Sequence, residues 1–176
     1  TDKASDPANF YALSKAMGEK LIIHSNLRNT NTRFVCIRGG NVLGTNGSVI
    51  HVFKKQINEK QKIGITDVNM TRFFLTVHDA IKLVFKATFD SVGGEIFVMK
   101  MPACKILDLA QVLIDASSKE NVQIETLGIR PGEKIHEQLL SEYESKMAYI
   151  CDEEYFVILP SIQIEGLKEH YAGYEL

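Results

Sequence analysis

Tyr11 and Lys15 stand four positions apart near the start of the chain. The apolar periodicity of residues 8–27 predicts a helix, which would place both side chains on one face. A tyrosine hydroxyl ionises near pH ~10 and is a weak base at neutral pH, but a neighbouring ammonium favours the phenolate. The pair is therefore suited to take a proton from an alcohol. The alternative is a surface helix with an exposed lysine, because such pairs often arise by chance.

The elements that must position this pair are predicted to alternate between helices and short strands, which indicates an α/β fold. Besides the first helix, helices are predicted at about 48–60, 77–89, 107–117 and, after Pro131 and Gly132, 134–140. Strands are predicted at 32–37, 62–66, 95–99 and 122–127. Two short apolar runs, 147–151 and 155–159, are predicted to form a hairpin or terminal strands.

Composition excludes several classes of partner. The chain has 176 residues, 45% hydrophobic and 24% charged, with a net charge of -2, which suggests neither nucleic acid nor a membrane surface. Cys36, Cys104 and Cys151 are scattered, so we expect reduced thiols in a cytoplasmic protein and no metal site. There is no signal peptide and no apolar run of the ~18 residues that a membrane span needs, although an anchor in upstream sequence is left open.

Five sequence blocks resemble one known family. The first, TDKASDPANFYALSK, places Thr-Asp-Lys directly ahead of the Tyr-Lys pair. The others are RGGNVLGTNGSVIHVFKKQI, ITDVNMTRFFLTVHDAIKLV, GGEIFVMKMPACKILDLA and GIRPGEKIHEQLLS. Together, in order from residue 1 to about 141, they resemble the extended short-chain dehydrogenase/reductases that act on UDP-sugars. Within that group they resemble the UDP-N-acetylglucosamine 4,6-dehydratases and the capsular polysaccharide biosynthesis proteins.

The resemblance implies that Thr1, Asp2, Lys3, Tyr11 and Lys15 are catalytic, and that Tyr11 and Lys15 also contact the cofactor. Lys3 is the candidate base at C5 of the sugar and Asp2 the candidate acid for the C6 hydroxyl, although the two could exchange roles. Thr1 is expected to hydrogen-bond the C4 hydroxyl beside Tyr11. Burial of a carboxyl and an amine would suit these roles. The alternative for Asp2 and Lys3 is a solvated ion pair.

The resemblance also implies substrate contacts at Asn41, Ser48 and Val49. An amide at the end of a strand can bind a diphosphate or a sugar, but Asn41 could instead stabilise the turn after the preceding glycines. Ser48 and Val49 open a predicted helix, a position that suits a nucleotide held by backbone groups. Ser48 could also be a simple N-cap, and both interpretations can hold together.

Arg72, Arg130 and Glu133 are the remaining substrate candidates. An arginine presents a planar fork to phosphate oxygens, and a glutamate can bond ribose hydroxyls. Pro131 and Gly132 predict a turn that would bring Arg130 and Glu133 to one ligand. For each arginine the alternative is a surface or helix-end ion pair.

The resemblance implies an NADP-dependent UDP-N-acetylhexosamine 4,6-dehydratase, with C5 inversion left open and NAD as the alternative cofactor. A UDP-sugar 4-epimerase of the same fold is the second hypothesis. The third, of another class, is a non-catalytic fragment that only binds substrate or assembles with a partner. We also expect a homo-oligomer in which Met17 and Leu21 belong to the core or to an interface.

The expected architecture is the C-terminal part of a Rossmann fold with a smaller α/β substrate-binding domain. Residues 1–45 are predicted to belong to the Rossmann domain, with the catalytic helix. Residues 46–176 are predicted to be mainly substrate-binding, with some returning Rossmann elements. No G-x-G-x-x-G or G-x-x-G-x-x-G occurs at a strand-to-helix turn, although a dinucleotide site needs such a turn. We therefore expect the cofactor-binding half to lie upstream of this chain.

Overall fold

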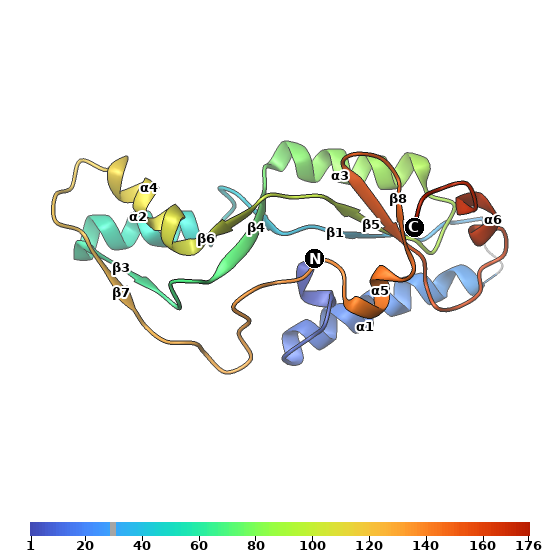
Figure 1. Ribbon diagram of the computed structural model, residues 1–176, viewed down its shortest axis with the longest axis horizontal. Coiled ribbons are helices and arrows are strands. Elements are labelled where there is room, and N and C mark those ends of the chain that lie inside the picture. The colour runs from blue at the N-terminus through green and yellow to red at the C-terminus, as the bar shows by residue number, and fades with distance from the viewer. Residues whose placement is uncertain (29–30) are drawn as a thin grey trace. The chain divides into compact units, whose positions relative to one another are not determined.

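The computed structural model describes residues 1–28 and 31–176. The chain divides into two compact units, and each unit is assembled from separate segments of sequence. The first unit comprises Thr1–Gly39, His78–Lys100 and Gln138–Leu176, and the second comprises Gly40–Val77 and Met101–Glu137. Figure 1 traces the chain through both units, whose helices and strands confirm the predicted α/β class. The assignment of roles on either side of residue 45 stays a prediction.

The first unit is built around a four-stranded sheet. Its order is β1 (Cys36–Arg38), β5 (Ile96–Met99), β9 (Tyr155–Ile158) and β8 (Ala148–Ile150). β1 and β5 are parallel, and the other two pairs are antiparallel. All four residues of β5 are buried because both faces of the sheet are covered, by α1 (Phe10–His24) and α3 (Val77–Asp90) on opposite sides (Figure 1). The predicted hairpin is confirmed as β8 and β9.

Four short elements complete the first unit. Two are 3₁₀ turns, η1 (Asp2–Ala4) and η2 (Ser25–Leu27), and two are short helices, α5 (Glu142–Ser145) and α6 (Leu167–Tyr171). Tyr171 anchors the C-terminal segment, since its ring is buried and its hydroxyl lies 3.4 Å from a carboxylate oxygen of buried Glu95.

The second unit contains two small sheets. One has the order β2 (Asn41–Val42), β4 (Thr71–Leu75) and β6 (Ala103–Lys105), and the other pairs β3 (Lys62–Ile65) with β7 (Gln123–Thr126) in parallel. The helices α2 (Val49–Lys60) and α4 (Ile106–Asp115) pack on each other and on β3. Their apolar faces and those of the strands form one core: Phe53, Ile57, Ile63, Ile65, Met70, Phe74, Ile106 and Ala110.

The helix predicted for 134–140 is wrong. This segment instead runs beside β4, where Thr71 N donates to Ile135 O at 3.0 Å and His136 forms a parallel bridge with Thr71. The guanidinium of Arg72 donates hydrogen bonds to the carbonyl oxygens of Lys134 and Ile135, each at 3.0 Å. In an α-helix, these carbonyls would accept hydrogen bonds from the backbone amides four residues later. Here they accept hydrogen bonds from β4 instead, so the segment is not helical.

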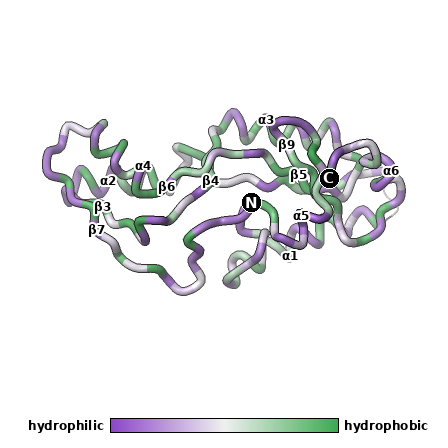
Figure 2. The backbone as a smooth tube through the Cα atoms, viewed as in Figure 1, coloured by the Kyte–Doolittle hydropathy of each residue, from purple (hydrophilic) through white to green (hydrophobic). Residues whose placement is uncertain are grey.

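The other predicted helices are confirmed to within a few residues, but the first strand begins later than predicted. β1 covers Cys36–Arg38 rather than 32–37, because Phe34 pairs with Asn26 and Gly94 instead of extending the ladder. The short strands β2, β4 and β6 were not predicted. α1 and α3 mix hydrophobic and hydrophilic residues along their length (Figure 2). Among the described helices, none has the length and apolar character needed to cross a bilayer.

Candidate active site

The segment that carries Thr1, Asp2 and Lys3 is a 3₁₀ turn tied to the end of β1. The backbone nitrogen of Thr1 donates to Ile37 O at 3.1 Å, and that of Asp2 donates to Gly39 O at 3.0 Å. The two bonds fix the turn to the backbone at the end of β1. The side chain of Thr1 caps the turn by accepting from Lys3 N at 3.4 Å.

Asp2 is the unusual group of this turn. The residue is only 4% exposed, and its Oδ1 lies 3.1 Å from Lys3 Nζ and 3.4 Å from Thr1 Oγ1. Its Oδ2 is buried and has no hydrogen-bond partner in the described part of the chain. Burying a carboxylate oxygen without a partner costs free energy, which sets this atom apart from the other oxygen of the same carboxylate. The solvated-pair alternative does not describe Asp2, although the Lys3 side chain is 30% exposed.

Tyr11 and Lys15 share one face of α1, as their spacing predicts. Asn9 begins the helix, with its side-chain oxygen accepting from Ala12 N at 2.9 Å. The Nζ of Lys15 lies 5.2 Å from the centre of the Tyr11 ring. Tyr11 is 61% exposed, so its hydroxyl is open to a ligand. The same helix packs directly on the turn of Asp2 and Lys3, which brings the two parts of the predicted catalytic set into one unit.

A buried charge cluster beneath this helix was not predicted. Arg38 in β1 is fully buried and donates to both carboxylate oxygens of Glu19 in α1 and both of Glu144 in α5. Burial alone would lower the pKa of Arg38, but the hydrogen bonds to Glu144 and Glu19 raise it overall. Burial likewise opposes ionisation of Glu144, yet the bonds from Arg38 and Ser141 lower its pKa to about 2. Nothing local in the sequence signals these distant partners of Arg38.

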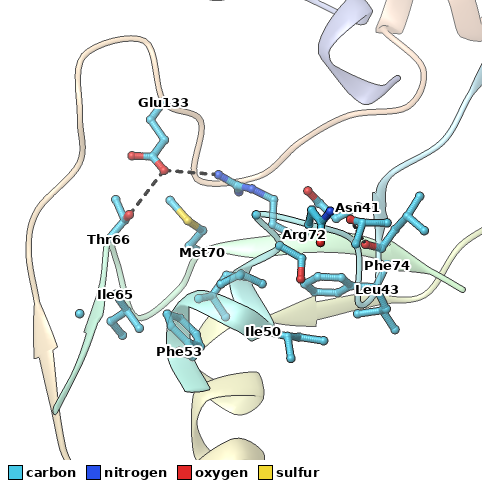
Figure 3. Close-up of a pocket in the computed structure, with 18 residues that line it drawn as sticks. Asn41, Leu43, Ile50, Phe53, Ile65, Thr66, Met70, Arg72, Phe74 and Glu133 are labelled. Carbon is cyan, nitrogen blue, oxygen red and sulfur yellow. Dashed lines mark hydrogen bonds and ion pairs between the residues drawn. The ribbon is translucent and has the colours of Figure 1, made fainter. Parts of the chain in front are cut away.

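The second unit contains a pocket of about 410 Å³. Apolar side chains form its floor, among them Phe53, Ile65, Met70 and Phe74, which belong to the core of the unit (Figure 3). Polar groups stand at its margin: Asn41, Thr45, Asn46, Ser48, Thr66, Arg72 and Glu133. An apolar floor with a few polar groups is the usual form of a small-molecule site.

One side of the pocket is the start of α2. Gly47, at a φ of +77°, allows the tight turn in which Ser48 N donates to Thr45 O at 3.0 Å. Ser48 occupies the N-cap position, but its hydroxyl makes no capping bond. Its Oγ is buried and, among the described residues, without a partner. The simple N-cap interpretation therefore does not account for this hydroxyl, which lines the pocket together with Val49.

Asn41 lines the same pocket from β2. Its amide nitrogen donates to Phe73 O at 3.2 Å, so part of the side chain stabilises the contact between β2 and β4. Gly40 just before it has no space for a side chain, because a Cβ there would lie 2.5 Å from Phe73 O. The turn-stabilising interpretation of Asn41 thus has a contact in its favour, while the substrate contact stays a prediction.

Arg72 and Glu133 meet across the pocket margin. Arg72 Nη2 lies 3.8 Å from Glu133 Oε1, and Thr66 donates to the same oxygen at 3.4 Å (Figure 3). Arg72 is also bound to three backbone carbonyls, those of Thr71, Lys134 and Ile135. It therefore holds the segment around residue 134 on β4, and a phosphate would have to compete with these bonds. A phosphate contact by Arg72 stays a prediction.

The turn predicted at Pro131 and Gly132 is present. Glu133 N donates to Arg130 O at 3.0 Å, and Arg130 N lies 3.4 Å from Glu133 Oε2. The turn directs Glu133 into the pocket, whereas Arg130 is exposed and is not among the residues that line it. The structure thus brings Asn41, Ser48, Val49, Arg72 and Glu133 together around one cavity and leaves Arg130 outside it.

These features were compared with known proteins. The sequence model of the family described as polysaccharide biosynthesis protein matches residues 1–159. The chain belongs to this family. It is 42% identical over 166 residues to a UDP-N-acetylglucosamine 4,6-dehydratase (inverting) of Campylobacter jejuni, a match that covers 93% of the chain and 48% of the relative. The resemblance read from the sequence blocks is confirmed at the level of this family.

Two further known proteins resemble the chain, one in sequence and one in both sequence and structure. The chain is 38% identical over 176 residues to a UDP-glucose 4-epimerase of Rickettsia canadensis, covering 99% of the chain and 50% of the relative. It superposes on the crystal structure of Pen from Bacillus thuringiensis with a TM-score of 0.85 at 39% identity, covering 91% and 51% of the two chains. The chain therefore spans about half the length of each of these relatives.

Proposed function

We propose that this chain carries the acid/base and nucleotide-binding residues of an NADP-dependent UDP-N-acetylhexosamine 4,6-dehydratase. The relative from Campylobacter jejuni is named a UDP-N-acetylglucosamine 4,6-dehydratase (inverting), which supports the reaction that we propose. Its name specifies no cofactor. The observation that carries the proposal is Asp2, whose Oδ2 is buried without a partner among the described residues while its Oδ1 contacts Lys3 Nζ. An elimination needs both a base and an acid, and this pair supplies both in one turn.

The Tyr11 and Lys15 face fits a nicotinamide nucleotide. Both side chains are exposed, and a phenol and an ammonium side by side can donate to the two hydroxyls of a ribose. The nicotinamide, when bound, supplies the chemistry of accepting a hydride from the sugar and returning it. Tyr11 then takes the proton of the C4 hydroxyl, and Lys15 stabilises the phenolate. Thr1 holds the same hydroxyl by a hydrogen bond.

Elimination falls to Asp2 and Lys3. Oxidation at C4 makes the C5 hydrogen acidic, because the neighbouring ketone stabilises the carbanion. Lys3 in its neutral form removes that proton, and Asp2 in its protonated form gives its proton to the departing C6 hydroxyl. The contact of 3.1 Å between Lys3 Nζ and Asp2 Oδ1 lets the two exchange a proton between turnovers. The unpartnered Oδ2 is the atom that we assign to the leaving hydroxyl.

The pocket of the second unit is proposed to hold the uridine diphosphate. Its apolar floor suits a flat base, and Glu133 at the margin suits ribose hydroxyls. The start of α2 offers free backbone amides and a helix dipole to a diphosphate, and the unpartnered hydroxyl of Ser48 adds a donor there. Arg130, exposed outside the pocket, is retained as a phosphate contact only by analogy with the family.

The test is to incubate the full-length protein containing this chain with UDP-N-acetylglucosamine and NADP and to weigh the sugar nucleotide. Loss of one water from the substrate, with uptake of solvent deuterium at C5, is the expected result. A product of unchanged mass would contradict dehydration. The Tyr11→Phe variant should form no product, which excludes turnover by a contaminating enzyme.

A UDP-sugar 4-epimerase is the second candidate, favoured by the relative from Rickettsia canadensis. Such an enzyme uses Tyr11 and returns the hydride to C4, so it needs no acid and base at C5 and C6. The Lys3→Met variant discriminates the two reactions. It should retain oxidation at C4 but lose dehydration, whereas epimerisation would continue without the amine.

We also propose a homo-oligomer that packs through α1. Phe10, Leu13, Met17 and Leu21 recur at helical spacing, and Phe10, Met17 and Leu21 are 91%, 67% and 63% exposed. Their exposure in this chain supports a docking face on α1, which we propose is an interface between subunits. A second copy of α1 would cover the face. Light scattering of the Met17→Glu variant should give half the mass of the wild type, and an equal mass would contradict this interface.

A further inference from the structure

We infer that the Arg38 cluster, formed by Arg38, Glu19 and Glu144, is a positioning device that sets the Tyr11 helix against the turn of Asp2 and Lys3. This inference rests on the proposed function of those residues. The cluster itself touches none of the atoms assigned to the reaction. Its role follows from which elements it joins and from how completely its donors are used.

Glu19 connects the cluster to the catalytic helix. It lies one helical turn beyond Lys15 on α1 and is itself buried. Arg38 Nε donates to Glu19 Oε2 at 2.9 Å, and Nη2 donates to Oε1 at 2.6 Å. Two parallel bonds between planar groups fix orientation as well as distance. The rotation of α1 about its own axis, which aims Tyr11 and Lys15, is therefore set by this pair.

Arg38 connects the cluster to the Asp2 turn through the backbone of β1. Its two neighbours, Ile37 and Gly39, accept the hydrogen bonds from the backbone nitrogens of Thr1 and Asp2. The strand around Arg38 thus binds the turn through the backbone of Ile37 and Gly39, and it binds the helix through the side chain of Arg38. Moving the guanidinium would change the spacing between Asp2 and Tyr11.

Glu144 and Leu139 hold the far side of the guanidinium. Arg38 Nη1 donates to Leu139 O at 2.9 Å and to Glu144 Oε2 at 2.8 Å, and Nη2 donates to Glu144 Oε1 at 2.6 Å. Glu144 is in turn fixed by the capping box with Ser141. All five N–H donors of the guanidinium are thereby used. Every rotation of the side chain would break at least one of these bonds.

The test compares Glu19→Gln with Glu144→Gln in the full-length protein. Each variant removes one carboxylate from the same guanidinium, and Glu144→Gln also weakens the capping box with Ser141, so it should lose at least as much stability as Glu19→Gln. Only Glu19 belongs to the catalytic helix. Glu19→Gln removes the link to the catalytic helix and should lower kcat by about 10- to 100-fold, with the KM for the UDP-sugar within twofold. Glu144→Gln loosens the guanidinium but keeps both of its bonds to Glu19, so it should lower kcat clearly less, by up to about tenfold. Equal losses of kcat in the two variants, or wild-type kcat in Glu19→Gln, would overturn the inference.

Two additions keep this test decisive. If Glu19→Gln does not fold, Glu19→Asp keeps the charge but shortens the side chain, and it should lower kcat in the same way with a smaller loss of stability.

Amide hydrogen exchange requires no turnover. Exchange should rise around Tyr11 and Lys15 in the Glu19 variants and only around α5 in Glu144→Gln, and the same pattern in both would refute the device. If the wild type forms no dehydrated product, the proposed function is refuted. The hydrogen-exchange comparison then still tests the inference about the Arg38 cluster.

Discussion

The Asp2 turn and the Arg38 cluster lie in the same unit and both bury charged groups, but they differ in how those groups are paired. The Asp2 carboxylate leaves one oxygen without a partner, whereas the guanidinium of Arg38 uses all five donors. Two helix starts repeat this contrast. Ser48 has a buried hydroxyl without a partner, and Ser141 forms a full capping box. In these two comparisons, incomplete pairing coincides with the residues assigned to substrate and complete pairing with those that hold the fold.

The largest effect should come from the incompletely paired side. Asp2→Asn should lower dehydration by about 100- to 10,000-fold, because it removes the acid. It should change the melting temperature little, since Oδ2 makes no bond to lose. Product formation and thermal unfolding measure the two effects. Asp108→Asn, an exposed change in the first turn of α4, serves as the control for handling and charge. A large loss of stability in Asp2→Asn would break the contrast.

Substitutions in the completely paired Arg38 cluster should lower the free energy of unfolding. Arg38→Met leaves the carboxylates of Glu19 and Glu144 buried and uncompensated, at a cost of about 3–5 kcal/mol in the free energy of unfolding. Lys62→Met is the matched control. Its ion pair with Glu125 is 2.6 Å long, but both side chains are 50% exposed, so its loss should cost less than about 1 kcal/mol. Urea titration distinguishes the two, and equal costs would argue against a structural role for burial.

The pH dependence of stability should sharpen the same contrast. The pKa of Glu144 is lowered from 4.5 to about 2 in the folded chain. A lowered carboxyl pKa stabilises the fold above the unfolded value, so this contribution, on the order of 3 kcal/mol, is lost as the pH falls from about 5 to about 2. Glu144→Gln should flatten this part of the profile of unfolding free energy. Glu142→Gln, an exposed neighbour on α5, should leave it unchanged.

The smallest effect should separate the two serines. Ser48→Ala should raise the KM for the UDP-sugar several-fold, the loss of about 1 kcal/mol of hydrogen bonding, without lowering stability. Ser141→Ala should do the reverse, with a loss of about 1 kcal/mol in stability and an unchanged KM. If both substitutions change only stability, the buried hydroxyl of Ser48 has no role in binding.

Prediction from sequence succeeded where the determining contacts are local. The helix of Tyr11 and Lys15, the turn at Pro131 and Gly132 and the terminal hairpin all follow from spacing and turn residues within a few positions. It failed where a distant partner decides. The helix predicted for 134–140 is replaced by bonds to β4, and the buried Arg38 binds Glu19 and Glu144, which lie far apart along the chain.

The candidate site shows the same limit. Sequence reasoning singled out a minority of the residues that line the pocket, namely Asn41, Ser48, Val49, Arg72 and Glu133. It did not indicate that the guanidinium of Arg72 already binds three carbonyls, or that Arg130 is not among the residues that line the cavity. Both facts depend on how segments separated by some sixty residues pack, which no local pattern contains.

The most direct test of the account is the mass of the product that the full-length protein and its Asp2→Asn variant form from UDP-N-acetylglucosamine with NADP. The account predicts a nucleotide sugar lighter by one water from the wild type, and none of it from a variant that remains folded. A product of unchanged mass from both proteins would contradict it, because the unpartnered carboxylate would then have no part in the reaction.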